Sequence, residues 1–494
     1  MFPYLYEVFI QSQKLIKRMM NKKSSYTRKI LLLIAIVFFC FLLPLWASDK
    51  KQGPGINIEI YPDQTINEHF CGFGAETLPW LWTKENMEMG VDDIDIRLNL
   101  ERIKEMRLPI TRIFVPWETW NPSVDYKTFS WDSDVMLSLY KTLDFYQKNG
   151  TKVILVTVDW LKDSPWLNEK ASAGAVLELL GHLVKVKGYT CIKFWTLTNE
   201  PELTYGWLKK LPYENYVRVH KLVKEGLKKK SLPIKIIASD EVESREWFDK
   251  TVRNLSTTAD IFASHAYFYP AQLFLFPDFF RERLKIIDKA SLSRKHPIFF
   301  LTEFGFRGTN FGACTNGLMG DYEYGIYTAQ MCIDALNSGV DGASLWCLYQ
   351  IRLVHVIHPE GGKMMRIGLW AYKDKDWQPF PIFYLYRLFT KYIKSDSKVL
   401  KVQVSPSDAL KAACVEKEGK YSLFVVNPTD QEKVFSVKLS FEFLNYKKYI
   451  YDKSALAISE NALSLISGQN KIKGRIEDNI AAHSVILYSN LDND

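Results

Sequence analysis

The size and composition of the chain indicate a globular protein of two domains. At 494 residues it is too long for one ordinary core, and its apolar content of 47% and charged content of 24% are those of a globular protein. The formal net charge is +8, but seven basic residues precede residue 30 and the remainder is nearly balanced. No stripe of Lys and Arg with interleaved aromatic residues is present, so we expect no nucleic-acid partner.

The N-terminal region is predicted to be a targeting segment that begins with a basic stretch at residues 1–29. Ile30–Trp46 holds 17 uncharged, apolar residues, and the small residues Ala47 and Ser48 follow it. This order is typical of a signal peptide, here at residues 30–47. An uncleaved anchor, with membrane attachment through residues 30–46, stays open because the apolar stretch lies at the short edge for a membrane span. Both alternatives predict an exported protein, either secreted or held at the cell surface.

From residue 69 to residue 395, short β-rich runs alternate with longer amphipathic helices. Such alternation predicts a parallel sheet, and eight repeats predict an α/β fold in which the sheet closes as a (β/α)₈ TIM barrel. The expected strands are Phe70–Ala75, Ile110–Phe114, Lys152–Val158, Ile192–Thr198, Ile234–Ala238, Ile261–His265, Ile298–Thr302 and Ala343–Cys347.

Residues 396–494 are predicted to form a second domain, an antiparallel β-sandwich. Short β-rich runs such as Tyr421–Val426, Val434–Leu439 and Ser484–Tyr488 are separated there by groups of turn residues. The segment 56–68, just before the barrel, begins with the alternating run Ile56–Ile60. We expect this segment to join the C-terminal sheet, which would bring the two ends of the folded chain together.

Two glutamates at the ends of predicted strands are the candidates for catalysis. Glu200 lies in Asn199-Glu200-Pro201, and Glu303 lies in a Thr-Glu-Phe-Gly sequence. They are 303 − 200 = 103 residues apart, which leaves room for about three strand–helix units between them. Both side chains could then meet at one rim of the barrel, and paired carboxylates are the equipment of a glycosidase.

Other strand ends also carry residues that could bind a sugar or tune the acids. Each has a simpler alternative: Arg112 could fill the barrel in an ion pair, Asn199 could cap a loop, and His265 could be a core histidine. Trp160 and Trp346 could be packing residues, and Glu76 could be a surface residue. The candidate substrate-binding residues are Arg112, Asn199, His265, Tyr267, Trp346, Trp160 and Glu76.

The set of strand ends resembles the large clan of retaining (β/α)₈ glycosidases with Asn-Glu on strand four and Glu on strand seven. Within it, the Gly72–Ala75 opening, the Phe383–Tyr386 region and the C-terminal sandwich resemble families that contain glucosylceramidases, β-xylosidases and endo-xylanases. The resemblance covers roughly residues 60–490 and does not specify a sugar.

The resemblance implies a role for each residue of the set. It makes Glu200 the general acid/base and Glu303 the nucleophile. Asn199 would bind the sugar 2-hydroxyl, His265 would orient sugar or acid, and Trp346 would form the floor of the site. Glu303 must be ionised to attack, so cationic and hydrogen-bonding neighbours are needed, and Arg112 and Tyr267 are the candidates.

The leading hypothesis is therefore a retaining β-glycosidase acting on a polysaccharide or oligosaccharide, with carboxyl groups about 5–5.5 Å apart. A transglycosylase would use the same residues, and a catalytically inactive glycan-binding barrel is the third alternative. We expect no cofactor and no metal site, because His355 and His358 lack acids or Cys at metal-ligand spacing.

Overall fold

The computed structural model describes residues 55–161, 164–203, 211–290, 298–312, 314–354, 362–454, 466–467 and 471–491. The predicted signal or anchor segment at residues 30–47 lies outside these ranges, as do His355 and His358. Within the ranges, the structure contains no helix with the length and apolar character that a membrane span requires. From Ile56 onward the chain packs as one unit.

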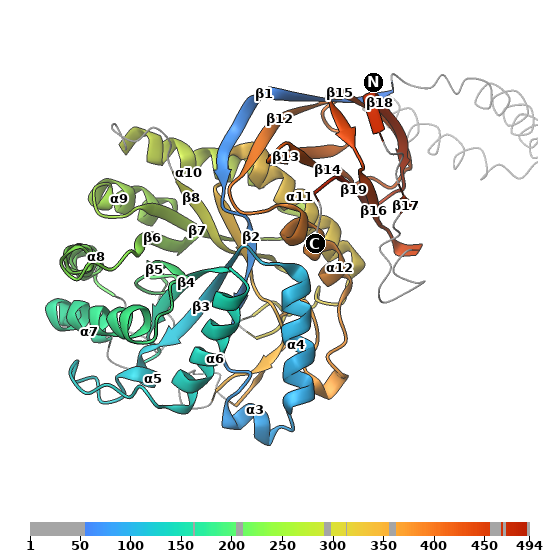
Figure 1. Cartoon of the computed structure of the whole chain (residues 1–494). Coiled ribbons are helices and arrows are strands. Elements are labelled where there is room, and N and C mark those ends of the chain that lie inside the picture. The colour runs from blue at the N-terminus through green and yellow to red at the C-terminus, as the bar shows by residue number, and fades with distance from the viewer. Residues whose placement is uncertain are drawn as a thin grey trace, which may run out of the picture. The chain divides into compact units, whose positions relative to one another are not determined.

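Eight parallel strands form a closed barrel, as the alternation in the sequence predicts (Figure 1). Neighbouring strands pair in sequence order, and the last strand pairs with the first, so the sheet has no free edge. The strands are almost entirely buried because helices cover the outside of the barrel, which explains their continuous apolar runs. They are β2 (Phe73–Thr77), β3 (Ile110–Pro116), β4 (Lys152–Val158), β5 (Ile192–Thr196), β6 (Lys235–Val242), β7 (Ile261–Phe268), β8 (Phe299–Phe306) and β9 (Gly342–Leu345).

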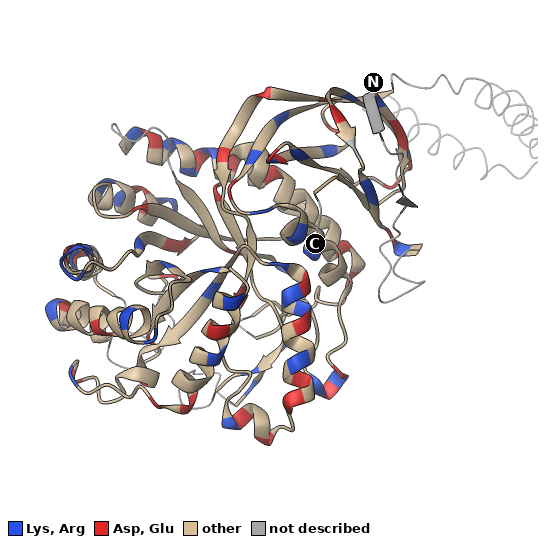
Figure 2. Cartoon of the chain, viewed as in Figure 1, with Lys and Arg blue, Asp and Glu red and all other residues tan. Residues whose placement is uncertain are grey.

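A long helix follows each barrel strand, and residues with polar side chains set where several of these helices begin. Ser133 caps the helix after β3 by accepting a hydrogen bond from the Met136 amide at 3.2 Å. Charged residues of both signs lie along the helices around the barrel (Figure 2). The long helices are α4 (Asp93–Met106), α6 (Asp134–Lys148), α7 (Glu169–Gly181), α8 (Tyr213–Lys229), α9 (Arg245–Leu255), α10 (Phe276–Ala290), α11 (Tyr322–Ser338) and α12 (Pro381–Tyr392); α3 (Lys84–Glu88) and α5 (Trp117–Trp120) are short.

The C-terminal region forms a sheet that also contains the first strand of the folded chain. The first strand, β1 (Ile56–Phe70), pairs antiparallel with β12 (Ser397–Ser405) and parallel with β15 (Lys433–Leu444). All nine strands are hydrogen-bonded in the order β17-β16-β19-β14-β13-β12-β1-β15-β18. The others are β13 (Lys411–Lys417), β14 (Lys420–Asn427), β16 (Lys447–Tyr451), β17 (Ile466–Ser467), β18 (Lys471–Ile480) and β19 (Ser484–Ser489).

Alternation along β14 attaches this sheet to the barrel. Leu423 and Val425 point into the sheet's own core, whereas Phe424 and Val426 belong to the barrel core. Phe424 stacks on Phe389 of α12 with ring centroids 4.3 Å apart. Burying one such aromatic side chain contributes roughly 1.5–3 kcal/mol, so the two regions stabilise each other.

Candidate active site

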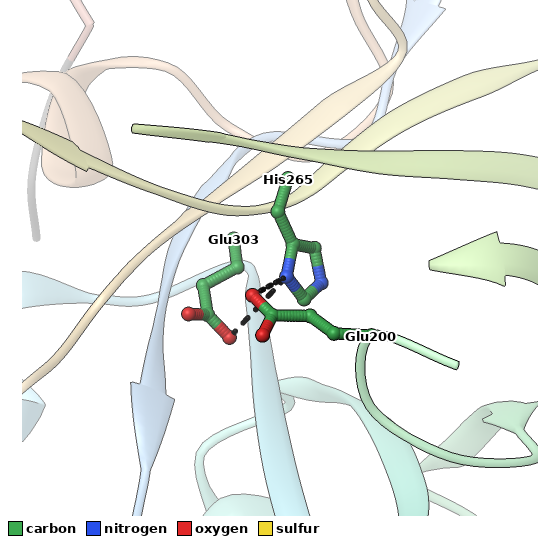
Figure 3. A group of neighbouring side chains, drawn as sticks. All are labelled: Glu200, His265 and Glu303. Atoms are coloured by element: carbon green, nitrogen blue, oxygen red, sulfur yellow. Dashed lines mark hydrogen bonds and ion pairs between the residues drawn. The ribbon is translucent and has the colours of Figure 1, made fainter. Parts of the chain in front are cut away.

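The two candidate glutamates meet at the carboxyl end of the barrel (Figure 3). Glu303 lies on β8, and Glu200 follows β5 in a loop where its own φ is +43°. The amide of Glu200 donates to the carbonyl of Asp240 at 3.1 Å, which holds this loop against β6. A carboxylate oxygen of each glutamate and one ring nitrogen of His265 all lie within 4.8 Å of one another. The structure thus brings together two acids that are 103 residues apart in the chain, as 303 − 200 = 103.

Arg112 is a fully buried cation that contacts Glu303. Its Nη1 donates to Glu76 at 2.9 Å and to Glu303 at 3.0 Å. Its Nη2 donates to the side-chain oxygens of Asn199 and Asp240, each at 2.8 Å. The guanidinium therefore connects four of the strand ends that contribute polar groups to the site, and it favours the ionised forms of its carboxylate partners.

His265 on β7 bridges the two candidate catalytic acids and a third acid. Its Nδ1 lies 3.0 Å from Glu200 and 3.8 Å from Glu303, and its Nε2 lies 3.3 Å from Asp240. Burial opposes the charged imidazolium, but the negative charges of Glu303 and Asp240 outweigh burial and raise the pKa of His265 well above its ordinary value. His265 is therefore a protonated, fully buried group of the site.

Asp240 is a central residue that the sequence analysis missed. The strand predicted to end at Ala238 continues to Val242, and a bulge between Ser239 and Glu241 leaves Asp240 unpaired with φ +53°. Bulges re-aim side chains beside active sites, and the carboxylate of Asp240 here contacts Arg112 and His265. The only sequence signal was an acid two residues after the end of a predicted strand.

The contacts of Asp240 keep it ionised. Burial alone would raise its pKa, but the charges of Arg112 and His265, together with a hydrogen bond from Thr302 at 2.5 Å, hold the pKa of Asp240 well below its usual range. Asp240 thus pairs with both cations of the site. One is Arg112, which contacts Glu303, and the other is His265, which contacts Glu200.

The environment of Glu303 contains two cations and a phenol. Burial raises its pKa, the charges of His265 and Arg112 lower it, and the nearby Glu200 raises it, with a net upward direction. The hydroxyl of Tyr267 donates a short hydrogen bond to Oε1 of Glu303. The cations and the phenol favour the ionised carboxylate that a nucleophile requires.

Glu76 on β2 is fully buried against Arg112, which excludes the surface alternative. Burial raises the pKa of Glu76 to about 8, although the charge of Arg112 opposes the shift. Its Oε1 has no hydrogen-bond partner among the described residues. Glu76 therefore supports Arg112, and its own carboxyl group is neutral near pH 7.

Aromatic rings cover the flank of the site between β3, β4 and β9. Trp160 and Trp346 are both partly buried, and each packs against Phe114, at 6.0 Å and 5.7 Å between ring centroids. The guanidinium of Arg112 lies 4.8 Å from the centroid of Phe114. Both indoles therefore pack against Phe114 and remain partly accessible. A role in packing and a role in binding a sugar are compatible for these two residues.

A small pocket of about 50 Å³ opens beside Glu200. Asp159 and Trp160 contribute to its wall, and Glu118 accepts a hydrogen bond from the amide of Trp160 at 3.2 Å. Burial raises the pKa of both Asp159 and Glu118 to about 7. The sequence analysis did not select Glu118, which lies in the short helix α5 directly after β3, four residues beyond the predicted strand end at Phe114.

A second layer of acids supports the Glu200 loop and β6. Glu202 accepts a hydrogen bond from the amide of Val242 at 2.6 Å, and burial raises the pKa of Glu202 to about 8. Glu241 lies 3.4 Å from the buried Arg283 of α10. These residues were also missed, because their partners lie far away in the sequence.

Glu200, His265 and Glu303 are close enough together to hold a metal ion. A metal requires an unprotonated ring nitrogen, however, and the surrounding carboxylates keep His265 protonated. Arg112 already supplies a positive charge to Glu303 at 3.0 Å. The donor set therefore fits a metal ion poorly.

No protein-family model matches this sequence, and no curated protein matches it. Solved structures do match it, although their sequence identity to the chain is low. The family 30, subfamily 8 glycoside hydrolase xylanase from Clostridium acetobutylicum has a TM-score of 0.58 at 14% identity over 88% of this chain and 99% of that one.

Two further solved structures carry other names. The α-L-arabinofuranosidase from Thermotoga maritima has a TM-score of 0.63 at 14% identity over 88% of this chain and 99% of that one. The glucosidase from Croceicoccus marinus has a TM-score of 0.63 at 10% identity over the same shares. At these identities the likeness establishes the fold: the chain has the closed (β/α)₈ barrel and attached β-sheet region of these glycoside hydrolases.

Proposed function

We propose that this protein is an exported retaining β-glycosidase that hydrolyses the O-glycosidic bonds of a polysaccharide or oligosaccharide. The observation that carries the proposal is the approach of Glu200 and Glu303, whose oxygens lie within 4.8 Å of each other and of His265. In retaining enzymes the carboxyl groups are about 5–5.5 Å apart, and in inverting enzymes about 6.5–9.5 Å. The short separation supports retention, because it leaves no room for a water molecule behind the sugar.

In the first step, an oxygen of Glu303 attacks the anomeric carbon and the bond to the leaving oxygen breaks. Glu200 gives its proton to that oxygen, so the leaving group departs as an alcohol. Arg112 and Tyr267 hold Glu303 in position and stabilise its charge before the attack. The product of this step is a glycosyl ester on Glu303.

In the second step, Glu200 acts as a base on a water molecule. The ester no longer carries the negative charge of Glu303, and this loss favours ionised Glu200. The His265 cation, whose Nδ1 lies 3.0 Å from Oε1 of Glu200, favours the ionised form of Glu200 further. Water then attacks the anomeric carbon, Glu200 takes its proton, and the ester bond to Glu303 breaks.

The remaining residues position the sugar. Asn199, held by Arg112 at 2.8 Å, is placed to bind the 2-hydroxyl of the attacked ring. Trp346 and Trp160 offer ring faces beside it, and a pyranose packs its apolar face on such rings. The apolar segment at residues 30–46 supports export, by cleavage or with an anchor.

A panel of aryl β-glycosides tests the activity, with the anomeric proton of the first product followed by NMR. We expect release of the aryl group from at least one sugar and a first product with retained configuration. Glu303→Gln, which keeps the shape of the side chain, is the matched control and should be inactive. Inverted product, or a fully active Glu303→Gln variant, would contradict the proposal.

A further inference from the structure

Exposed aromatic rings lie next to the nucleophile on the side of the site formed by β7 and β8. Tyr269 and Phe311 are 51% and 37% exposed, and both lie beyond the ends of these strands. Phe311 packs against Tyr267 with ring centroids 5.5 Å apart. Tyr267 in turn donates to Glu303, so the exposed rings continue directly from the candidate nucleophile.

Arg307 joins the two exposed rings into one surface. Its guanidinium carbon lies 6.0 Å from the centroid of Tyr269 and 5.8 Å from that of Phe311. The amide of Arg307 donates to the carbonyl of Phe268 at 2.9 Å, which fixes its backbone beside β7. We call Tyr269, Arg307 and Phe311 the rim platform.

Glu243 attaches the rim platform to the catalytic residues. One oxygen of Glu243 accepts the amide of Tyr267 at 2.8 Å and lies 3.4 Å from Nη2 of Arg307. Arg307 carries five N–H donors, of which the buried Nε–H has no acceptor among the described residues and Nη2 donates to Glu243. The platform therefore combines exposed ring faces with a guanidinium whose donors are incompletely used.

The two flanks of the site differ in chemistry. Toward β2, β3 and β5, the polar groups are Glu76, Arg112 and Asn199; Glu76 and Arg112 are fully buried, and the partly exposed Asn199 can meet a hydroxyl group of the attacked ring. Toward β7 and β8, Tyr267 separates Glu303 from the aromatic rings of the platform. The rim platform therefore forms the aromatic side of the site, next to Tyr267 and away from these polar groups.

We propose that the rim platform is a binding subsite for a sugar unit of the leaving group, so that the enzyme prefers oligosaccharide or polysaccharide substrates. This inference rests on the proposed glycosidase activity. The apolar face of a pyranose stacks on the rings of Tyr269 and Phe311, and its hydroxyl groups accept hydrogen bonds from Arg307. A leaving group without hydroxyl groups would use only part of this surface.

The test compares two substrates that share the sugar found active in the aryl-glycoside panel. One is an oligosaccharide, whose leaving group is a sugar, and the other is the glycosyl fluoride, whose leaving group is too small to reach the platform. Phe311→Ala should lower the ratio of kcat/KM for the oligosaccharide to kcat/KM for the fluoride about tenfold, the effect of losing one stacked ring. Tyr269→Ala should act in the same direction, and Phe311→Tyr should restore the ratio to within about twofold.

Phe274→Ala is the matched control. This ring is 72% exposed on the same connection after β7 and has no ring partner among the described residues, so the ratio should not change. An equal loss on both substrates would show that Phe311 only supports Tyr267 and would overturn the subsite. An unchanged ratio in Phe311→Ala would overturn it as well. If the wild-type protein hydrolyses no aryl glycoside of the panel, the proposed function itself is wrong.

Discussion

Asp240 and His265 form a fully buried ion pair in which Oδ1 of Asp240 lies 3.3 Å from Nε2 of His265. The opposite nitrogen of the same ring lies 3.0 Å from Glu200. The negative charges of Glu303 and Asp240 together raise the pKa of this ring, which contacts Glu200. This relationship makes Asp240 a positioning residue with a measurable electrostatic effect.

Asp240→Asn should lower kcat/KM and shift the pH profile. The substitution keeps the shape of the side chain but removes one of the charges that raise the pKa of His265, so the imidazole loses its proton at lower pH. We expect a decrease of roughly 10- to 100-fold, equivalent to about 1.4–2.7 kcal/mol, and an alkaline limb that begins at lower pH. Asp249→Asn, in a surface pair with Arg253 on α9, is the control and should leave both unchanged. An unaltered alkaline limb in Asp240→Asn would contradict the assigned role.

Glu76→Gln should be nearly silent at acidic and neutral pH. The pKa of Glu76 is raised to about 8, so the wild-type side chain is neutral there and Gln has the same charge. We expect kcat/KM within about threefold of wild type at about pH 6 and a growing difference above about pH 8, where the wild-type carboxyl ionises. Glu76→Ala, which removes one of the four acceptors of Arg112, should lose at least about tenfold at every pH. Measuring kcat/KM of both variants and of the wild type from about pH 6 to above about pH 8, by pre-steady-state and steady-state assays, would distinguish the two variants.

The protein should be less stable in mild alkali than in mild acid. Burial raises the pKa values of Glu118, Asp159, Glu202 and Glu76 to between about 7 and about 8. A carboxyl with a raised folded pKa contributes stability that is fully present below its unfolded pKa and is lost as pH rises through the folded value. We expect Tm to fall by at least about 3 °C between about pH 5.5 and about pH 8.5, and Glu202→Gln to reduce the fall. A Tm that rises over this interval would contradict the buried, neutral state of these acids.

The sequence predicted the parts of the fold that depend on local patterns. Strands buried on both faces left continuous apolar runs such as Lys152–Val158, and the alternation of Ile56–Ile60 predicted the strand that pairs in the C-terminal sheet. Boundaries were less accurate at the rim, where β6 extends four residues beyond the predicted Ala238 to Val242. The extension follows from the bulge at Asp240, and nothing local in the sequence determines a bulge.

The candidate site could be predicted only where a side chain lies in or shortly after a recognisable strand. Arg112, His265 and Glu303 met that condition, and the structure places Arg112 3.0 Å and His265 3.8 Å from Glu303. Glu118 and Glu202 lie in connections, and their importance arises from burial and from partners 42 and 40 residues away. Such partners exist only after the chain has folded.

The two catalytic assignments predict opposite responses to azide. Glu303→Ala should not form a glycosyl ester, and azide should restore some turnover by attacking from the vacated side, with inverted product. Glu200→Ala should retain a fast first step for activated aryl glycosides and lose most activity on poor leaving groups, because those need a proton. Azide should then give a product of retained configuration. The opposite pattern in the two variants would mean that the roles of Glu200 and Glu303 are exchanged.

Trapping of the covalent intermediate tests the central claim most directly. Wild-type protein incubated with 2-deoxy-2-fluoro glycosyl fluorides of the active sugar should gain the mass of one sugar, because slowed hydrolysis lets the ester accumulate. Peptide mapping by mass spectrometry should place that sugar on Glu303, with no label in Glu303→Gln. A sugar attached to another residue, or a wild-type enzyme that hydrolyses the parent glycoside yet is never labelled, would contradict Glu303 as the nucleophile.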